Sequence, residues 1–154
     1  MPALALVSLA AGVAAQTSDP FIGTWRLSPE KSVYESGQAP QSFSRIYEDR
    51  GGGVILLTVE GFNAQGLVSR VQLVYKRDGK EYPEASTGAR GIRHVAVRAV
   101  DRFTEELSFT LDGRAIETLN TITVSKDGRT LTQRVTGVTA QGQRYTNTVV
   151  YDRQ

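Results

Sequence analysis

The chain has 154 residues, which is long enough for one domain with a sizeable core and too short for two ordinary domains. Hydrophobic residues make up 40% of it, the net charge is only +2, and basic and acidic residues are interspersed, so we expect a globular protein without a nucleic-acid partner. Cysteine is absent, which excludes disulfides, thiolate metal sites and a cysteine nucleophile, and we expect no metal and no other cofactor.

Residues 1–16 are predicted to lie outside the fold, as a signal peptide or, alternatively, a disordered alanine-rich tail. Residues 3–15 are small and apolar and end in Val13-Ala14-Ala15, an acceptable cleavage pattern, although the usual positive start is missing. Thirteen residues are too few to span a bilayer, which needs about 20, and no cysteine is present for a lipid anchor, so we expect no stable membrane anchor. A signal peptide predicts that the mature domain, residues 17–154, is exported to the periplasm or beyond.

From residue 21 onward the pattern is that of β-strands. Alternating or β-branched runs cover residues 21–27, 43–49, 54–60, 67–76, 92–100, 105–111, 115–124, 131–138 and 145–152. Several of the breaks between them carry Asp-Gly pairs, which favour tight hairpin turns: Asp78-Gly79, Asp112-Gly113 and Asp127-Gly128. Short hairpins between successive strands predict an all-β fold, a closed antiparallel up-and-down barrel of about 8–10 strands. No substantial helix is expected beyond one turn within residues 29–36.

Two longer segments, residues 28–41 and 83–91, contain proline and glycine and lack a periodic pattern. On a barrel these would be long loops at the open end, where ligands enter, or plain surface connections. Several strand faces mix aromatic, apolar and single polar side chains, which suits the wall of a partly wet cavity; half-buried tyrosines with their hydroxyls at the rim are the alternative. The residues predicted to contact a ligand are Arg45, Tyr47, Tyr75, His94, Arg134, Tyr145, Asn147 and Tyr151.

The opening strand, Phe-Ile-Gly-Thr-Trp-Arg-Leu at residues 21–27, resembles that of the calycins, the lipocalins and fatty-acid-binding proteins, which share a Gly-x-Trp motif there. Nearly the whole mature chain resembles small exported bacterial lipocalin-like proteins of unsettled function, through GTWRLSPEKSVY, YKRDGKEYP, VSKDGRTLT and VVYDRQ. The resemblance implies a calycin barrel with Gly23 and Trp25 in structural roles. It also implies an arginine stacked on Trp25, for which Arg153 and Arg134 are the candidates.

The chain departs from the fatty-acid-binding proteins in two places. Residues 28–41 are too few and too rich in proline and glycine for the helix-turn-helix lid of that family. The terminal Arg-x-Tyr pair that grips a fatty-acid carboxylate there is incomplete, because Tyr151 matches the tyrosine while Val149 takes the place of the arginine. A similar grip would need its charge from Arg134 or Arg45.

Catalytic signals are weak. His94 is the only histidine, and one histidine without any cysteine cannot form the usual zinc sites. His94 is a candidate general base or haem ligand. More commonly, a lone histidine on a strand is a hydrogen-bonded wall residue. No GxSxG elbow or phosphate-binding glycine motif is present. The arginine-rich stretch at residues 90–102 lacks interleaved aromatics and is predicted to be a solvated surface.

These patterns predict an exported barrel protein that binds a small apolar or amphipathic molecule in its interior, with no catalytic residue. The first alternative is a barrel enzyme of the isomerase, cyclase or hydrolase kind that uses His94 with a cavity tyrosine or arginine. The second is a structural or protein-interaction module. The sequence predicts no oligomeric state.

Overall fold

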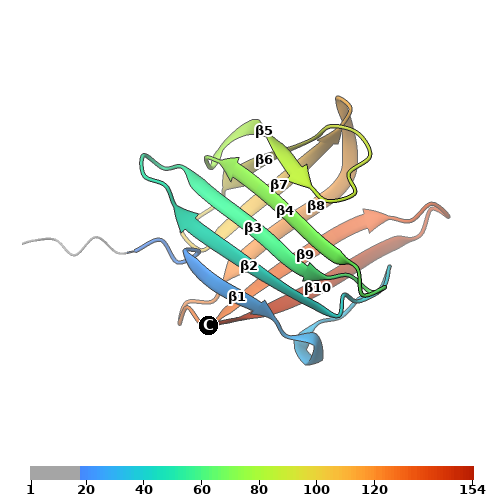
Figure 1. Cartoon of the computed structure of the whole chain (residues 1–154), viewed down its shortest axis with the longest axis horizontal. Coiled ribbons are helices and arrows are strands. Elements are labelled where there is room, and N and C mark those ends of the chain that lie inside the picture. Colours follow the sequence, from blue (N-terminus) through green and yellow to red (C-terminus); the bar gives the residue numbers. More distant parts are fainter. Residues whose placement is uncertain (1–17) are drawn as a thin grey trace, which may run out of the picture.

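The computed structural model describes residues 18–154, so the segment interpreted as a signal peptide lies outside the described residues. Ten antiparallel strands form a closed barrel in which each strand pairs with its neighbours in the chain and β1 pairs with β10 (Figure 1). This confirms the predicted all-β barrel. The strands are β1 Gly23–Leu27, β2 Ser42–Asp49, β3 Ile55–Phe62, β4 Val68–Tyr75, β5 Asp78–Ser86, β6 Arg93–Ala99, β7 Thr104–Leu111, β8 Arg114–Val124, β9 Thr130–Val138 and β10 Arg144–Arg153.

Strand β5 corrects the sequence-based assignment, which placed a hairpin turn at Asp78-Gly79 and a loop at residues 83–91. Asp78 and Gly79 instead lie in the strand at an irregularity in the β5–β6 pairing, where Gly79 has a φ of 76° and Asp78 Oδ1 accepts a hydrogen bond from the Lys80 amide. Pro83 is also in the strand, opposite His94. Its missing N–H is tolerated because β4 and β5 are paired at only three positions.

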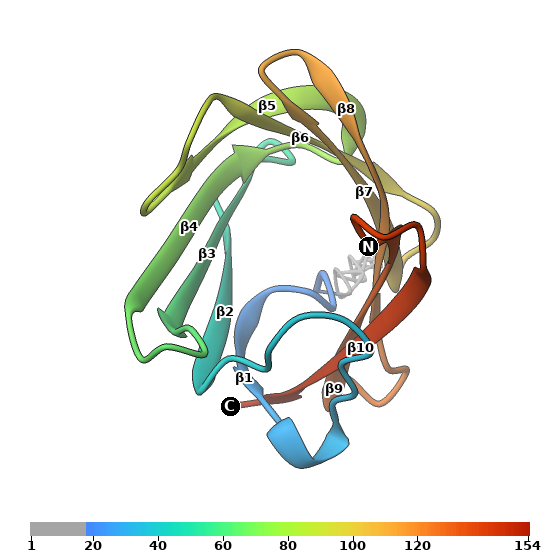
Figure 2. The ribbon, with the colours of Figure 1, turned by 90° about the vertical axis from the view of Figure 1, so that its right-hand side faces the viewer.

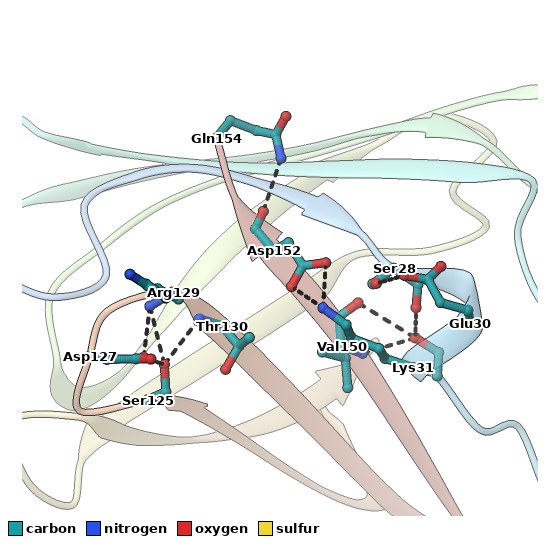
Figure 3. A network of polar contacts seen from close by, with 11 residues as sticks. Ser28, Glu30, Lys31, Ser125, Asp127, Arg129, Thr130, Val150, Asp152 and Gln154 are labelled. Atoms are coloured by element: carbon teal, nitrogen blue, oxygen red, sulfur yellow. Dashed lines mark hydrogen bonds and ion pairs between the residues drawn. The ribbon is translucent and has the colours of Figure 1, made fainter.

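The segment between β1 and β2 begins with a single 3-10 turn, η1, Pro29–Lys31, with Ser28 at the N-cap position as the sequence predicts. Lys31 forms an ion pair with Asp152 near the end of β10, in the polar network of Figure 3. Val33 then bridges to Thr148, and the chain arches past β10 and across part of the barrel end on its way to β2 (Figure 2). We call this end, where β2 begins and β3 ends, the open end. Among residues 18–154, no helix is long and apolar enough to cross a membrane.

The opposite end of the barrel is where β1 begins, and we call it the floor. Trp25 is fully buried there, and its Nε1 donates a hydrogen bond of 2.9 Å to the Phe21 carbonyl. The Arg153 guanidinium stacks on the indole, 4.0 Å from the ring centroid, and donates to the carbonyls of Ile22, Pro20 and Gly128. Of the two arginines considered for this role, the one in contact is therefore Arg153.

Gly23 is the point at which the floor tolerates no side chain. Its φ is 132°, and a Cβ there would lie 2.8 Å from Arg153 Nη1. We expect Gly23→Ala to lower the free energy of unfolding by about 1–3 kcal/mol, because it combines backbone strain with displacement of a tethered guanidinium. Urea unfolding followed by the fluorescence of Trp25 measures it. Gly37→Ala is the control, since Gly37 also has a positive φ but has no atom within 4 Å of its Cβ position; equal losses in both variants would contradict the role of the Arg153 contact.

Candidate ligand-binding cavity

A cavity of about 240 Å³ lies inside the barrel. This is somewhat below the ~300–1,000 Å³ usual for drug-sized ligands, so its occupant must be small. Most of the wall is apolar, and the polar groups are few and come from separate strands. The lining residues are Phe43, Arg45, Leu57, Val59, Ser69, Val71, Leu73, Glu84, Arg93, Val95, Leu107, Phe109, Asn120, Gln133 and Tyr151.

Arg45 is the principal polar group of the cavity and is only 5% exposed. The alternation of β2 directs it inward, one position above Tyr47 on the same face. Its Nε and Nη2 donate to the Tyr47 hydroxyl at 3.2 and 3.0 Å, and its Nη1 donates to Gln133 Oε1 at 3.0 Å. Burial raises the pKa of Tyr47, so this hydroxyl stays neutral and leaves the charge of Arg45 in place.

No carboxylate among residues 18–154 lies within ion-pair distance of Arg45. The hydrogen bonds that Arg45 donates to Tyr47 and Gln133 all go to neutral oxygens, and its guanidinium carbon lies 5.6 Å from the ring centroid of Tyr151. Glu105, which is paired with Arg77, interacts with Arg45 only at longer range. A buried cation with no carboxylate in contact is unfavourable in an apolar wall, and an anion in the cavity would relieve that. The guanidinium fork also matches the two oxygens of a carboxylate.

An amide pair extends the polar contacts of Arg45 along the wall. Gln133, which accepts from Arg45, donates from Nε2 to Asn120 Oδ1 at 3.1 Å. The two amides come from β9 and β8 and fix the direction in which the guanidinium points. Sequence reasoning did not select either residue, although the parity of β9 places Gln133 on the same face as the buried Leu131.

A second polar group in the wall is formed by Glu84 on β5 and Arg93 on β6, which face each other across the two strands. Arg93 Nη1 lies 3.5 Å from Glu84 Oε1, and its guanidinium lies 4.4 Å from the ring centroid of Phe109. Burial raises the pKa of Glu84, and the charge of Arg93 opposes that shift. Arg93 therefore lines the cavity with part of its side chain, which the sequence did not predict, while 38% of the side chain stays exposed.

Of the residues predicted to contact a ligand, Arg45 and Tyr151 line the cavity. Tyr47 lies below Arg45 and holds it. Tyr75 is buried at the floor, with its hydroxyl 3.5 Å from Glu105 Oε1. Asn147 instead fastens the β1–β2 segment, because its Oδ1 accepts from the amides of Glu35 and Ser36 and its Nδ2 donates to the Ser36 carbonyl.

The other three predicted residues do not reach the cavity. Tyr145 lies toward the open end against Gly137, its partner on β9. His94 has the opposite strand parity to the cavity residues Arg93 and Val95, and it is half-buried on the outer side of β6. Arg134 is exposed on the outer side of β9, next to the inward-facing Gln133.

The floor below the cavity is held by a buried ionic cluster. Glu105 is 1% exposed, and its Oε2 accepts from Arg77 Nε at 2.7 Å. Arg77 also pairs with Asp19 ahead of β1, and its guanidinium lies 4.6 Å from the ring centroid of Phe21. Burial raises the pKa of Glu105, and Arg77 opposes that shift. This cluster fastens the N-terminal side of β1 to the barrel. None of its residues lines the cavity, although Glu105 interacts at longer range with Arg45.

Within the part of the chain that the structure describes, no group of three or more His, Asp or Glu side chains is placed to hold a metal ion. The closed barrel of ten antiparallel strands is consistent with a calycin-like fold, while membership of that family stays a prediction. No protein-family model matches the sequence, and a search of curated proteins finds no match either.

Proposed function

We propose that this protein binds one small amphipathic acid inside its barrel, with the acid group against Arg45. The observation that carries the proposal is a guanidinium buried in the wall of a largely apolar cavity, with no carboxylate in contact with it among residues 18–154. A carboxylate would place a negative charge in direct contact with Arg45 and accept charge-assisted hydrogen bonds from the fork. The apolar remainder of the ligand would lie along Leu57, Leu73 and Val95.

The location of His94 favours binding over the histidine-based enzyme considered from the sequence. It is the only histidine of the chain, and the lining of the cavity does not include it. A general base must reach the proton that it abstracts, and a side chain on the outer side of the wall does not. Combined with the predicted signal peptide, this supports an exported carrier of a small acid.

The test is binding of decanoate to the purified mature protein, measured by native mass spectrometry and calorimetry. We expect one decanoate per barrel. We expect decanol, which has the same chain without the charge, to bind at least about tenfold more weakly, because a hydrogen bond to a charged group contributes about 1.5–3 kcal/mol. Absence of bound decanoate or any other fatty acid of similar length would refute the proposal. Equal affinity for decanol would show that Arg45 does not bind the acid group.

A further inference from the structure

Glu84 carries a buried oxygen that accepts no hydrogen bond from residues 18–154. Its side chain is only 6% exposed, and it lines the cavity. Its Oε1 is fully buried and accepts no hydrogen bond from any of residues 18–154; its contact with Arg93 Nη1, at 3.5 Å, is an ion pair only. An acceptor buried without a donor is destabilising, so such an atom facing a cavity points to a donor on whatever occupies it.

The same position offers an unused donor. Arg93 Nε is buried and finds no acceptor within residues 18–154, although the guanidinium packs on Phe109 and touches Glu84. One acceptor and one donor, on side chains that face each other across β5 and β6, thus remain unsatisfied in one stretch of wall. Since the two charges compensate one another, this stretch has no need of a further ion.

We infer that Glu84 and Arg93 form a hydroxyl-binding subsite, so that the acid carried by the barrel is a hydroxylated one. A hydroxyl is the simplest group that donates one hydrogen bond and accepts another, and it can serve Glu84 Oε1 and Arg93 Nε together. An ammonium group has no acceptor for Arg93, and a second carboxylate has no donor for Glu84. This inference rests on the proposed function, in which Arg45, on a different strand, takes the carboxylate.

The test compares decanoate with a series of hydroxydecanoates that carry the hydroxyl at successive carbons. A hydroxyl buried without partners weakens binding, so a preference for one position requires a site built for it. We expect one isomer to bind about tenfold tighter than decanoate, the size expected for hydrogen bonds to charged groups. We expect Glu84→Leu to abolish this preference, measured as the ratio of hydroxydecanoate to decanoate affinity within the same variant. Glu84→Gln, which keeps the shape of the side chain, should reduce the preference, and Glu81→Gln, on the exposed side of β5, should leave it unchanged.

The outcomes separate this inference from the proposed function. If decanoate binds and every hydroxydecanoate binds equally or more weakly, the subsite is refuted and the acid-binding barrel stands; a bound water then satisfies the two atoms. A preference that survives in Glu84→Leu also refutes the subsite. If neither decanoate nor any hydroxydecanoate binds, the proposed function itself is refuted, and the subsite with it.

Discussion

Replacing Arg45 by methionine is expected to weaken decanoate binding by about tenfold to a hundredfold and to leave decanol binding nearly unchanged. The variant loses the charge-assisted contact with the carboxylate, worth about 1.5–3 kcal/mol in total, and keeps an apolar side chain of similar length. Its stability should change little, because two effects oppose each other. Removal of a buried cation with no carboxylate in contact stabilises the barrel, while Tyr47 and Gln133 each lose a donor and Glu105 loses a longer-range attraction.

Arg134→Met is the matched control, because it removes the same charge from the exposed outer side of β9. Calorimetry with decanoate and decanol on both variants gives four affinities. Loss of decanoate binding in Arg45→Met alone supports a direct contact. A similar loss in both variants would mean that overall charge attracts the ligand, and no loss in either would show that the acid group lies elsewhere.

The barrel could be predicted because its signals are local. Alternation in the strands, Asp-Gly turns such as Asp112-Gly113 and the Gly-x-Trp opening all act over a few residues, and each agrees with the closed sheet. Strand β5 could not be predicted, because its sequence DGKEYPEAS contains a turn signal and a proline and has little apolar alternation. It is extended because β4 and β6 flank it in a closed barrel, which is a tertiary effect that no local propensity reports.

The cavity was predicted less well, for a related reason. Strand parity tells which residues share a face, but a shift of one residue exchanges the two faces. On β6 the sequence analysis placed His94 on the inner side of the barrel, whereas the inner side carries Arg93 and Val95. Glu84 was missed because its strand was missed. Arg45 was found because Phe43, Arg45 and Tyr47 form one face of their strand. Which of the three lies at the level of the cavity could not be predicted, because it depends on how the barrel closes.

The largest loss of stability is expected for Arg77→Met, at about 3–5 kcal/mol at pH 7. Glu105 then remains buried at 1% exposure without the guanidinium that now lies 2.7 Å from it. The ion pair between Arg77 and Asp19 is lost as well, so the segment before β1 is no longer held to the barrel through Asp19. Urea unfolding followed by the fluorescence of Trp25, the only tryptophan, measures the change. Arg98→Met is the control: Arg98 is 63% exposed, its pair with Glu106 lies at the surface, and the expected loss is below about 1 kcal/mol.

The pH dependence of this loss identifies its cause. Burial already raises the pKa of Glu105 above 4.5, and removal of Arg77 takes away the charge that opposes the rise. An acid whose pKa is higher in the folded state binds more protons there, so stability falls as pH rises from the unfolded pKa through the folded one. The penalty of Arg77→Met should therefore be small near pH 4.5 and larger at pH 7, and a second change, Glu105→Gln, should remove most of it at pH 7. A penalty independent of pH, or one that Glu105→Gln does not relieve, would assign it to lost packing on Phe21 instead.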